Sequence, residues 1–326
     1  MFSKQCPSLG IPLICIGNAV AGGAGKTPTT LAIAALLKEQ GYRVHIVTKG
    51  YGGRIKEATQ VSVTFHTSRD VGDEAFLMAT HGWPVWVGKH RYPLAKRAQD
   101  AGADVVLFDD GLQDWCMPYD IRILVVDAHY GFGNGHLLPM GPLRESIPHV
   151  LQRVDALCVL HEHSEAHEKQ PLPFAKGYSG GWIHTSRQIT LPPALKKGDA
   201  VVAFAGIGNP EQFQQGILNA GLDLRGFYIF PDHHFYSEKE ITILQEAATQ
   251  QRCPLLTTEK DFVRLSLLPK TMLNQILFLP LTIPMQGENL DKLVEILSPV
   301  ITSPRRGRGD PEISKNPKEG LDGHAH

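Results

Sequence analysis

The sequence predicts an α/β protein in which helices cover both faces of a parallel sheet, followed by a second, smaller α/β domain. Short apolar runs rich in β-branched residues alternate with stretches of helical period through the first half of the 326-residue chain. Strands that are apolar along their whole length belong to parallel sheets buried on both faces. A second alternation of the same kind begins near residue 200. Two layered domains are therefore expected.

The elements of the first domain follow one another in the order strand, helix, strand. The predicted strands are Pro12–Gly17, Arg43–Thr48, Asp104–Phe108, Ile121–Val126 and Ala156–Leu160. Helical period covers Thr29–Gln40, which Gly41 ends, and Leu94–Ala101. In such sheets the ligand lies beyond the carboxyl ends of the strands.

The second domain repeats this pattern on a smaller scale. Its predicted strands are Ala200–Ala205, Gly226–Phe230, Pro254–Thr257 and Gln275–Pro280, and its predicted helices are Glu211–Ala220 and Ser237–Thr249. From Pro304 onward, proline, glycine and charged residues replace any apolar period, which is typical of a disordered tail. The predicted limits are a first domain over 1–160, a linker over 161–190, a second domain over 191–303 and a tail over 304–326.

Composition excludes several classes of protein. Lys and Arg (32) nearly balance Asp and Glu (33), so the overall charge gives no indication of a nucleic-acid partner. The five cysteines are scattered without disulfide-like spacing, which fits a reducing compartment. We expect no signal peptide and no transmembrane helix, because no apolar run approaches the roughly 18 residues that a bilayer requires. The oligomeric state is left open.

The segment Ile11–Pro28 is the most informative part of the chain. A β-prone run leads into closely spaced glycines, whose backbone N–H groups can close around an anion, and then into a helix whose positive dipole end points at the same place. Lys26 would contact the β- and γ-phosphates, and the Thr27 hydroxyl would bind Mg²⁺. Val20 stands where the usual pattern has a further glycine, and Ala21 where some variant loops have a lysine. We predict a P-loop for ATP comprising Gly22, Gly23, Ala24, Gly25, Lys26, Thr27 and Pro28.

Asp109 and Asp110 end an apolar strand that should lie beside this loop. A carboxylate at that place is where the partner of a phosphate-bound Mg²⁺ belongs. Asp-Asp-Gly is also good turn chemistry, but the loop upstream favours the metal.

Three further polar groups are ambiguous from the residues alone. Asp73 and Glu74 open a helical stretch, which a simple N-cap would explain. Arg144 could neutralise phosphate oxygens and Glu145 could reach a metal, or the two could form a surface ion pair. His233 follows a strand of the second domain and could tune a carboxylate base, although a loop histidine without a role is the simpler interpretation.

Taken in order, these motifs resemble the tetraacyldisaccharide 4′-kinase family, the lipid A kinases of Gram-negative bacteria. The resemblance runs from about Ile11 to about Leu297. The matching landmarks are Gly17-Asn18 with the P-loop, Lys49–Gly53, Gly72-Asp73-Glu74, Asp109–Gln113, Gly133-Asn134, Leu138-Pro139, Gly141–Glu145, Phe204–Pro210, Asp232-His233 and Thr257–Asp261.

The resemblance implies a Mg²⁺-assisted kinase that uses ATP to phosphorylate the 4′-hydroxyl of tetraacyldisaccharide 1-phosphate, giving lipid IVA. It implies that Asp73 is the general base and that His233 assists from the other domain. Lys26 carries over as a catalytic phosphate-binding group, and Asp110, Gln113 and Arg144 line the nucleotide site. The implied metal set is Thr27, Asp109 and Glu145.

Members of that family usually carry an apolar or amphipathic segment before the first strand, which attaches them to the cytoplasmic face of the inner membrane. Here only about ten residues precede that strand, too few for such an anchor. We expect peripheral membrane contact, and we expect the natural start of the protein to lie upstream of Met1.

Two other functions are compatible with the motifs. One is a variant-loop ATPase switch that acts through dimerisation, against which the residues Ala21, Arg144, Glu145 and His233 argue. The other is a soluble kinase that uses the same scaffold for a different acceptor.

Overall fold

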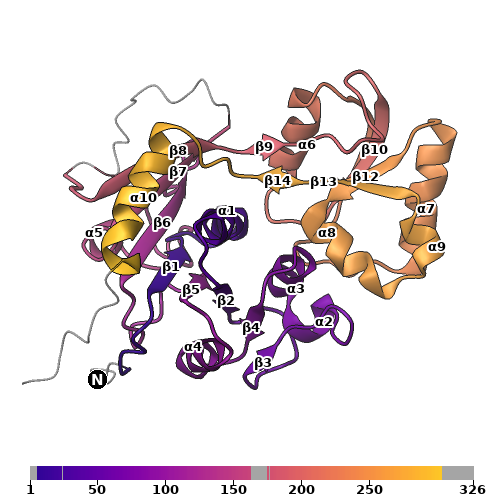
Figure 1. Cartoon of the computed structure of the whole chain (residues 1–326). Helices are drawn as coiled ribbons and strands as arrows, with labels where there is room; N and C mark the ends of the chain where they lie inside the picture. The colour runs from indigo at the N-terminus through magenta and orange to yellow at the C-terminus, as the bar shows by residue number, and fades with distance from the viewer. Residues whose placement is uncertain (1–5, 24, 163–174, 176, 303–326) are drawn as a thin grey trace, which may run out of the picture.

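The computed structural model describes residues 6–23, 25–162, 175 and 177–302, which form two α/β domains (Figure 1). The predicted tail and most of the first half of the predicted linker lie outside the described residues. Each domain is built on its own sheet, and a two-stranded ladder lies in the connection between them.

The first domain is organised around an eight-stranded sheet in the order β3-β4-β2-β5-β1-β6-β7-β8. Every neighbouring pair is parallel except β3 and β4. The strands are β1 (Leu13–Gly17), β2 (Val44–Thr48), β3 (Thr59–Gln60), β4 (Val85–Val87), β5 (Val105–Asp109), β6 (Ile121–Asp127), β7 (Ala156–His161) and β8 (Gly181–Ser186). The helices are α1 (Lys26–Glu39), α2 (Ser68–Val71), α3 (Asp73–Thr80), α4 (Arg91–Asp100) and α5 (Ile147–Leu151).

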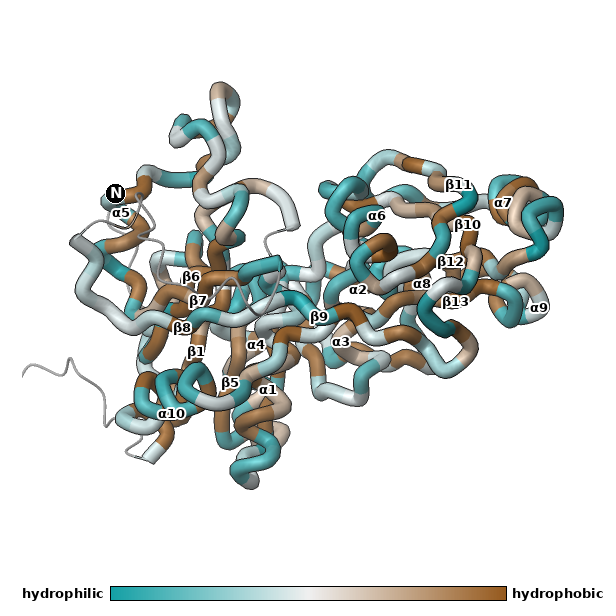
Figure 2. The backbone as a smooth tube through the Cα atoms, turned by 90° about the horizontal axis from the view of Figure 1, so that it is seen from above, coloured by the Kyte–Doolittle hydropathy of each residue, from teal (hydrophilic) through white to brown (hydrophobic). Residues whose placement is uncertain are grey.

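The alternation of side chains along the strands divides the core of this domain into two layers. On β1, Ile14 and Ile16 belong to one apolar cluster, and Leu13 and Cys15 belong to the other. Helices α1 and α3 contribute to the first cluster, whereas α4 and α5 contribute to the second. Both faces of the sheet are therefore covered, as the apolar strands predict. The hydrophobic colouring of β1, β6 and β7 in Figure 2 reflects this double burial.

The second domain has a four-stranded parallel sheet in the order β11-β10-β12-β13. Its strands are β10 (Ala200–Ala205), β11 (Asp223–Ile229), β12 (Leu255–Thr258) and β13 (Ile276–Leu279). Helix α6 (Pro210–Asn219) packs on one face and α7 (Glu238–Gln250) on the other. The short elements α8 (Glu259–Arg264), η3 (Leu265–Leu267) and α9 (Lys270–Leu273) link β12 to β13.

Two elements lie elsewhere than the predicted limits would place them. The strand β8, inside the predicted linker, pairs with β7 and extends the first sheet. Helix α10 (Glu288–Ile301), inside the predicted second domain, returns to pack on β8 and buries Leu293 and Leu297 in the core of the first domain. The chain thus crosses between the domains twice, through β9 (Gln188–Ile189) and β14 (Leu281–Thr282), which pair antiparallel.

Among the described residues, no helix is both long enough and apolar enough to cross a bilayer.

Candidate active site

The glycine loop joins the end of β1 to the start of α1, at the carboxyl edge of the sheet. Gly25 precedes the helix with a φ of 88°, a left-handed conformation that favours glycine. A Cβ at this position would lie 2.4 Å from Leu160 Cδ1, so space also requires glycine here. Ala24 lies outside the described residues, whereas the other residues of the predicted P-loop, from Gly22 to Pro28, line a cavity.

The Lys26 side chain folds back along the loop. Its Nζ donates to Asn18 Oδ1 at 3.1 Å and to the Gly22 carbonyl at 3.4 Å, and it lies 3.9 Å from Asp110 Oδ1. The ammonium group therefore stands beside the helix N-terminus, where the dipole also favours an anion.

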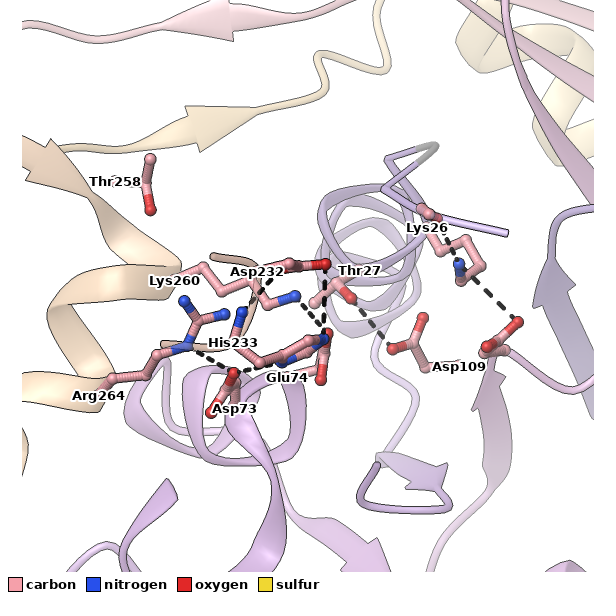
Figure 3. A network of polar contacts seen from close by, with 12 residues as sticks. Lys26, Thr27, Asp73, Glu74, Asp109, Asp232, His233, Thr258, Lys260 and Arg264 are labelled. Atoms are coloured by element: carbon pink, nitrogen blue, oxygen red, sulfur yellow. Dashed lines mark hydrogen bonds and ion pairs between the residues drawn. The ribbon is translucent and has the colours of Figure 1, made fainter. Parts of the chain in front are cut away.

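Thr27 and Asp109, two of the predicted metal ligands, contact each other directly. The Thr27 hydroxyl donates to Asp109 Oδ2 at 3.1 Å (Figure 3). The Thr30 hydroxyl donates to Asp109 Oδ1 at the same distance. Asp109 ends β5, the neighbour of β1, and is only 2% exposed. Burial raises its pKa to about 6, although the nearby Lys26 charge opposes this. Hydroxyl and carboxylate oxygens at a phosphate loop are the donors that Mg²⁺ prefers, so the pair fits this ion.

Asp110, Gln113 and Arg144 form a second polar group on the cavity wall. Arg144 Nη1 donates to both carboxylate oxygens of Asp110, at 3.0 and 3.1 Å, and lies 3.3 Å from Gln113 Oε1. Asp110 has a φ of 58°, which turns the chain sharply after β5. The three predicted nucleotide-binding residues are thus brought together near Lys26.

Glu145 is held differently. Its carboxylate accepts a hydrogen bond from Gln113 Nε2 at 3.2 Å, pairs with Arg153, and lies 3.3 Å from His149 Nδ1. It is not among the described residues that line the cavity. No cluster of three or more His, Cys, Asp or Glu side chains suited to a metal ion occurs in the described part of the chain. The predicted metal role of Glu145 stays a prediction, and its contacts favour a structural role.

A further group of polar residues around Asp73 is built from both domains. Asp73 begins α3, is 3% exposed, and receives two bonds on Oδ2 from the second domain (Figure 3). His233 Nδ1 lies 2.8 Å from this oxygen, and Arg264 Nε donates to it at 2.6 Å. Burial opposes the ionisation of Asp73, but the His233 hydrogen bond and the Arg264 charge together outweigh it and lower the pKa of the carboxyl.

His233 lines the cavity, whereas Asp73 is not among the described residues that do. Nδ1 of His233 is directed at Asp73. The other ring nitrogen, Nε2, lies 3.8 Å from Asp232 Oδ2. The ring of Tyr51 stands 5.5 Å from the imidazole, centroid to centroid. The histidine therefore lies between the buried carboxylate and the cavity.

Sequence reasoning missed Arg264, whose side chain is fully buried. Besides Asp73, its guanidinium contacts Asp261 Oδ1 at 2.7 Å and the Gly206 carbonyl at 2.6 Å. The run Thr257–Asp261 was recognised without a role for its members. Arg264 follows Asp261 by three residues on one helix, but nothing local indicates that its guanidinium reaches Asp73 in the other domain.

One cavity of about 860 Å³ connects the two halves of the site. Lys26, Thr27, Asp109 and Arg144 line it from the first domain, and Asn209, Asp232 and His233 from the second. The residues predicted to bind phosphate and His233 thus share one space between the domains.

Comparison with known proteins covers nearly the whole chain. The family described as tetraacyldisaccharide-1-P 4′-kinase matches residues 2–298. A tetraacyldisaccharide 4′-kinase of Bradyrhizobium sp. (strain BTAi1 / ATCC BAA-1182) is 41% identical over 256 residues, which are 78% of this chain and 74% of the relative. Another, of Bartonella tribocorum, is 37% identical over 277 residues, or 84% and 79% of the two chains. The crystal structure of "apo" form LpxK from Aquifex aeolicus in complex with ATP matches with a TM-score of 0.72 and 26% identity, covering 91% of this chain and 90% of that one.

Proposed function

This chain belongs to the tetraacyldisaccharide-1-P 4′-kinase family, and we propose that it transfers the γ-phosphoryl group of ATP to the 4′-hydroxyl of tetraacyldisaccharide 1-phosphate, giving lipid IVA. The observation that carries this proposal is a cavity shared by the two domains, with the P-loop on one wall and His233 on another. It brings a bound nucleotide and a sugar hydroxyl to one place, which phosphoryl transfer requires above all.

On the nucleotide side, the chain supplies charge. Lys26 and Arg144 would neutralise phosphate oxygens, and the N–H groups at the start of α1 would add to this field. Thr27 and Asp109 would hold Mg²⁺, which neutralises the β- and γ-phosphate oxygens when bound. Without a nucleotide, the ion pair with Asp110 holds the Arg144 guanidinium at the cavity wall.

On the acceptor side, the chain removes a proton. We propose that the 4′-hydroxyl gives its proton to Nε2 of His233 as its oxygen bonds to the γ-phosphorus, while the bond to the bridging oxygen breaks and its electron pair leaves with ADP. Asp73 would hold Nδ1–H and stabilise the imidazolium. The resemblance implies Asp73 itself as the base. Its burial behind His233 supports an indirect action through the imidazole.

We further propose peripheral contact with the cytoplasmic face of the inner membrane through the loop of residues 129–142. Four large apolar side chains of this loop are exposed, Met140 by 78%, and the others are Tyr130, Leu137 and Leu138. The backbone bonds from Ala21 N to the Pro142 carbonyl (2.7 Å) and from Arg144 N to the Ala19 carbonyl (2.8 Å) attach the end of this loop to the P-loop segment. Such a surface suits the acyl chains of a membrane lipid.

The function is tested by incubating the protein with Mg²⁺, ATP and a defined tetraacyldisaccharide 1-phosphate and measuring the mass of the lipid product by mass spectrometry. A mass gain of one phosphate on the non-reducing sugar is expected. Lys26→Ala should lower the rate about 10²- to 10³-fold because it removes a charge beside the transferring group. Lys96→Ala, which removes an exposed ion pair with Asp100, is the matched control. ATP hydrolysis that rises with protein self-association, without lipid product, would favour the ATPase switch instead.

The membrane contact is tested by sedimentation with vesicles of phosphatidylethanolamine and phosphatidylglycerol. Replacing both Leu138 and Met140 with serine should lower the membrane partition coefficient by about a hundredfold or more if both side chains are fully buried in the bilayer, since each side chain contributes about 1.5–3 kcal/mol on burial. If the double variant binds the vesicles as well as the unaltered protein does, this role of the loop is refuted.

A further inference from the structure

Arg187 occupies the junction between the two domains. It lies between the end of β8 and the start of β9, and its backbone N–H donates to the His161 carbonyl at 3.0 Å. Although it belongs to a connection, its side chain is only 8% exposed. No motif in the sequence singles it out, because it stands alone between two short strands.

The guanidinium of Arg187 lies against the phosphate loop. A Cβ built on Gly25 would be 3.7 Å from its Nη2 and 3.9 Å from its Nε. The residue also lines the cavity between the domains. A buried cation therefore faces the loop at the point where a glycine lets a ligand come close.

The hydrogen-bonding capacity of this guanidinium is largely unused. Nη2 lies 2.7 Å from Asp127 Oδ2, an ion pair without the geometry of a hydrogen bond, and Nη1 is buried with no partner among the described residues. Asp127 itself also accepts the backbone N–H groups of His129 and Tyr130. A buried guanidinium with free donors is costly unless a ligand satisfies them.

The position of Arg187 in the sheet indicates which part of a nucleotide it would meet. Thr27 and Asp109 form the metal pair on the β5 side of β1, whereas Arg187 follows β8, beyond β6 and β7 on the other side. The group to be transferred belongs near the metal pair. Arg187 is thus placed for phosphates that remain on the nucleotide after transfer.

We propose that Arg187 is a nucleotide-binding residue that donates hydrogen bonds to the α- or β-phosphate, on the side of the loop away from the metal. This inference rests on the proposed function. Because these phosphates are common to ATP and ADP, Arg187 should contribute to the binding of both nucleotides by a similar factor, and less to the transfer step itself.

The test is calorimetric titration of the full chain with Mg²⁺ and ADP, and with Mg²⁺ and a non-hydrolysable ATP analogue. Arg187→Met should weaken both affinities about ten- to hundredfold, the range expected for lost hydrogen bonds to a charged group. Arg187→Lys should recover part of the loss, because a point charge remains. Arg225→Met, which breaks an exposed ion pair on β11, is the control and should bind as the unaltered protein does.

Three results would overturn the inference. Unchanged ADP affinity in Arg187→Met, with only a lower melting temperature, would make the residue purely structural. A loss restricted to the ATP analogue would place it at the γ-phosphate. An equal loss in Asp127→Asn, which removes the ion pair but keeps the cation, would assign the effect to the pair itself. If the unaltered protein binds neither nucleotide, the proposed function fails first.

Discussion

Asp73 is a carboxylate that stays charged although it is almost fully buried. Burial alone would favour its neutral form, but His233 and Arg264 both form hydrogen bonds with its Oδ2 and favour the charged form. Both partners come from the second domain. The charge state of this residue therefore depends on contact between the domains, and removing either partner would leave a buried charge only partly compensated.

At this scale the first prediction concerns Asp73→Asn. The amide keeps the size of the side chain but cannot stabilise an imidazolium on His233. We expect kcat to fall by about 10²-fold or more, within the range of acid–base contributions, with little change in the KM for ATP. Steady-state kinetics measure both constants, and Asp100→Asn on the surface of α4 serves as the control. Equal losses in kcat and in ATP affinity would contradict a role in proton removal.

The residues that sequence could identify are those whose chemistry is local. Lys26 and Thr27 follow a glycine run, and Asp109 ends an apolar strand, so their neighbours in the chain indicate their roles. Arg264 depends on a contact across the domain boundary, and Arg187 on contacts with Asp127 and Gly25, which are far away in the sequence. No pattern of spacing predicts such contacts.

Helix α3 of the first domain packs against helix α8 of the second, and the two form an interface between the domains. Three ion pairs join them: Asp73 with Arg264, Glu74 with Lys260 at 2.7 Å, and His81 with Glu259 at 2.9 Å. The first two lie near the start of α3, and the third at its end. Because the pairs are spread along α3, this interface fixes the angle between the helices as well as their separation.

The His81–Glu259 pair gives the interface a dependence on pH. The hydrogen bond to Glu259 raises the pKa of His81 above 6.5, although burial opposes this. The contribution of the His81–Glu259 pair to the free energy of unfolding is therefore complete well below pH 6.5, the pKa of an ordinary histidine. It is lost as the pH rises through the raised pKa of His81 in the folded protein. His81→Gln should lower stability at pH 6 by only about 0.5 kcal/mol, because the pair is partly screened by solvent, and by less at pH 9.

Thermal unfolding at the two pH values measures this difference. A shift of about 1–2 °C at pH 6 is expected from the usual relation between stability and melting temperature. His90→Gln, at an exposed position before α4, is the control. A loss at pH 9 as large as that at pH 6 would contradict an ionic contribution.

Elements differ in how far the sequence reveals them. Strands such as β5 and β10 are apolar along their length, so their positions were predicted within one or two residues. The strand β8 has a mixed pattern with Trp182 and His184 only partly buried, and β9 and β14 have two residues each. Such segments become strands because a partner is already present, which a local pattern cannot indicate.

At the scale of the whole molecule, the second domain is an insertion between β8 and α10. The apolar face of α10 covers β8, with Leu293 fully buried, so this helix completes the core of the first domain. None of the described residues of α10 lines the cavity. We therefore expect α10 to contribute to the stability of the first domain.

Leu293→Ala tests this arrangement. We expect a loss of about 2–5 kcal/mol in the free energy of unfolding, the usual cost of truncating a buried leucine. The melting temperature should fall by about 5–15 °C, while ADP affinity well below the transition should be retained. Lys292→Ala on the same helix, at a partly exposed position, should change little. A large loss of ADP affinity in the folded variant would show that α10 influences the site.

The late position of α10 in the sequence has a consequence for biosynthesis. About 100 residues separate β8 from α10, and ribosomes add about 5–20 residues each second, so the apolar surface over β8 stays uncovered for roughly 5–20 s after its strand has been translated. During that time the nascent chain exposes the apolar face of the sheet over β8 to solvent and to other chains. The interval before α10 is translated is therefore when this apolar face is most open to aggregation.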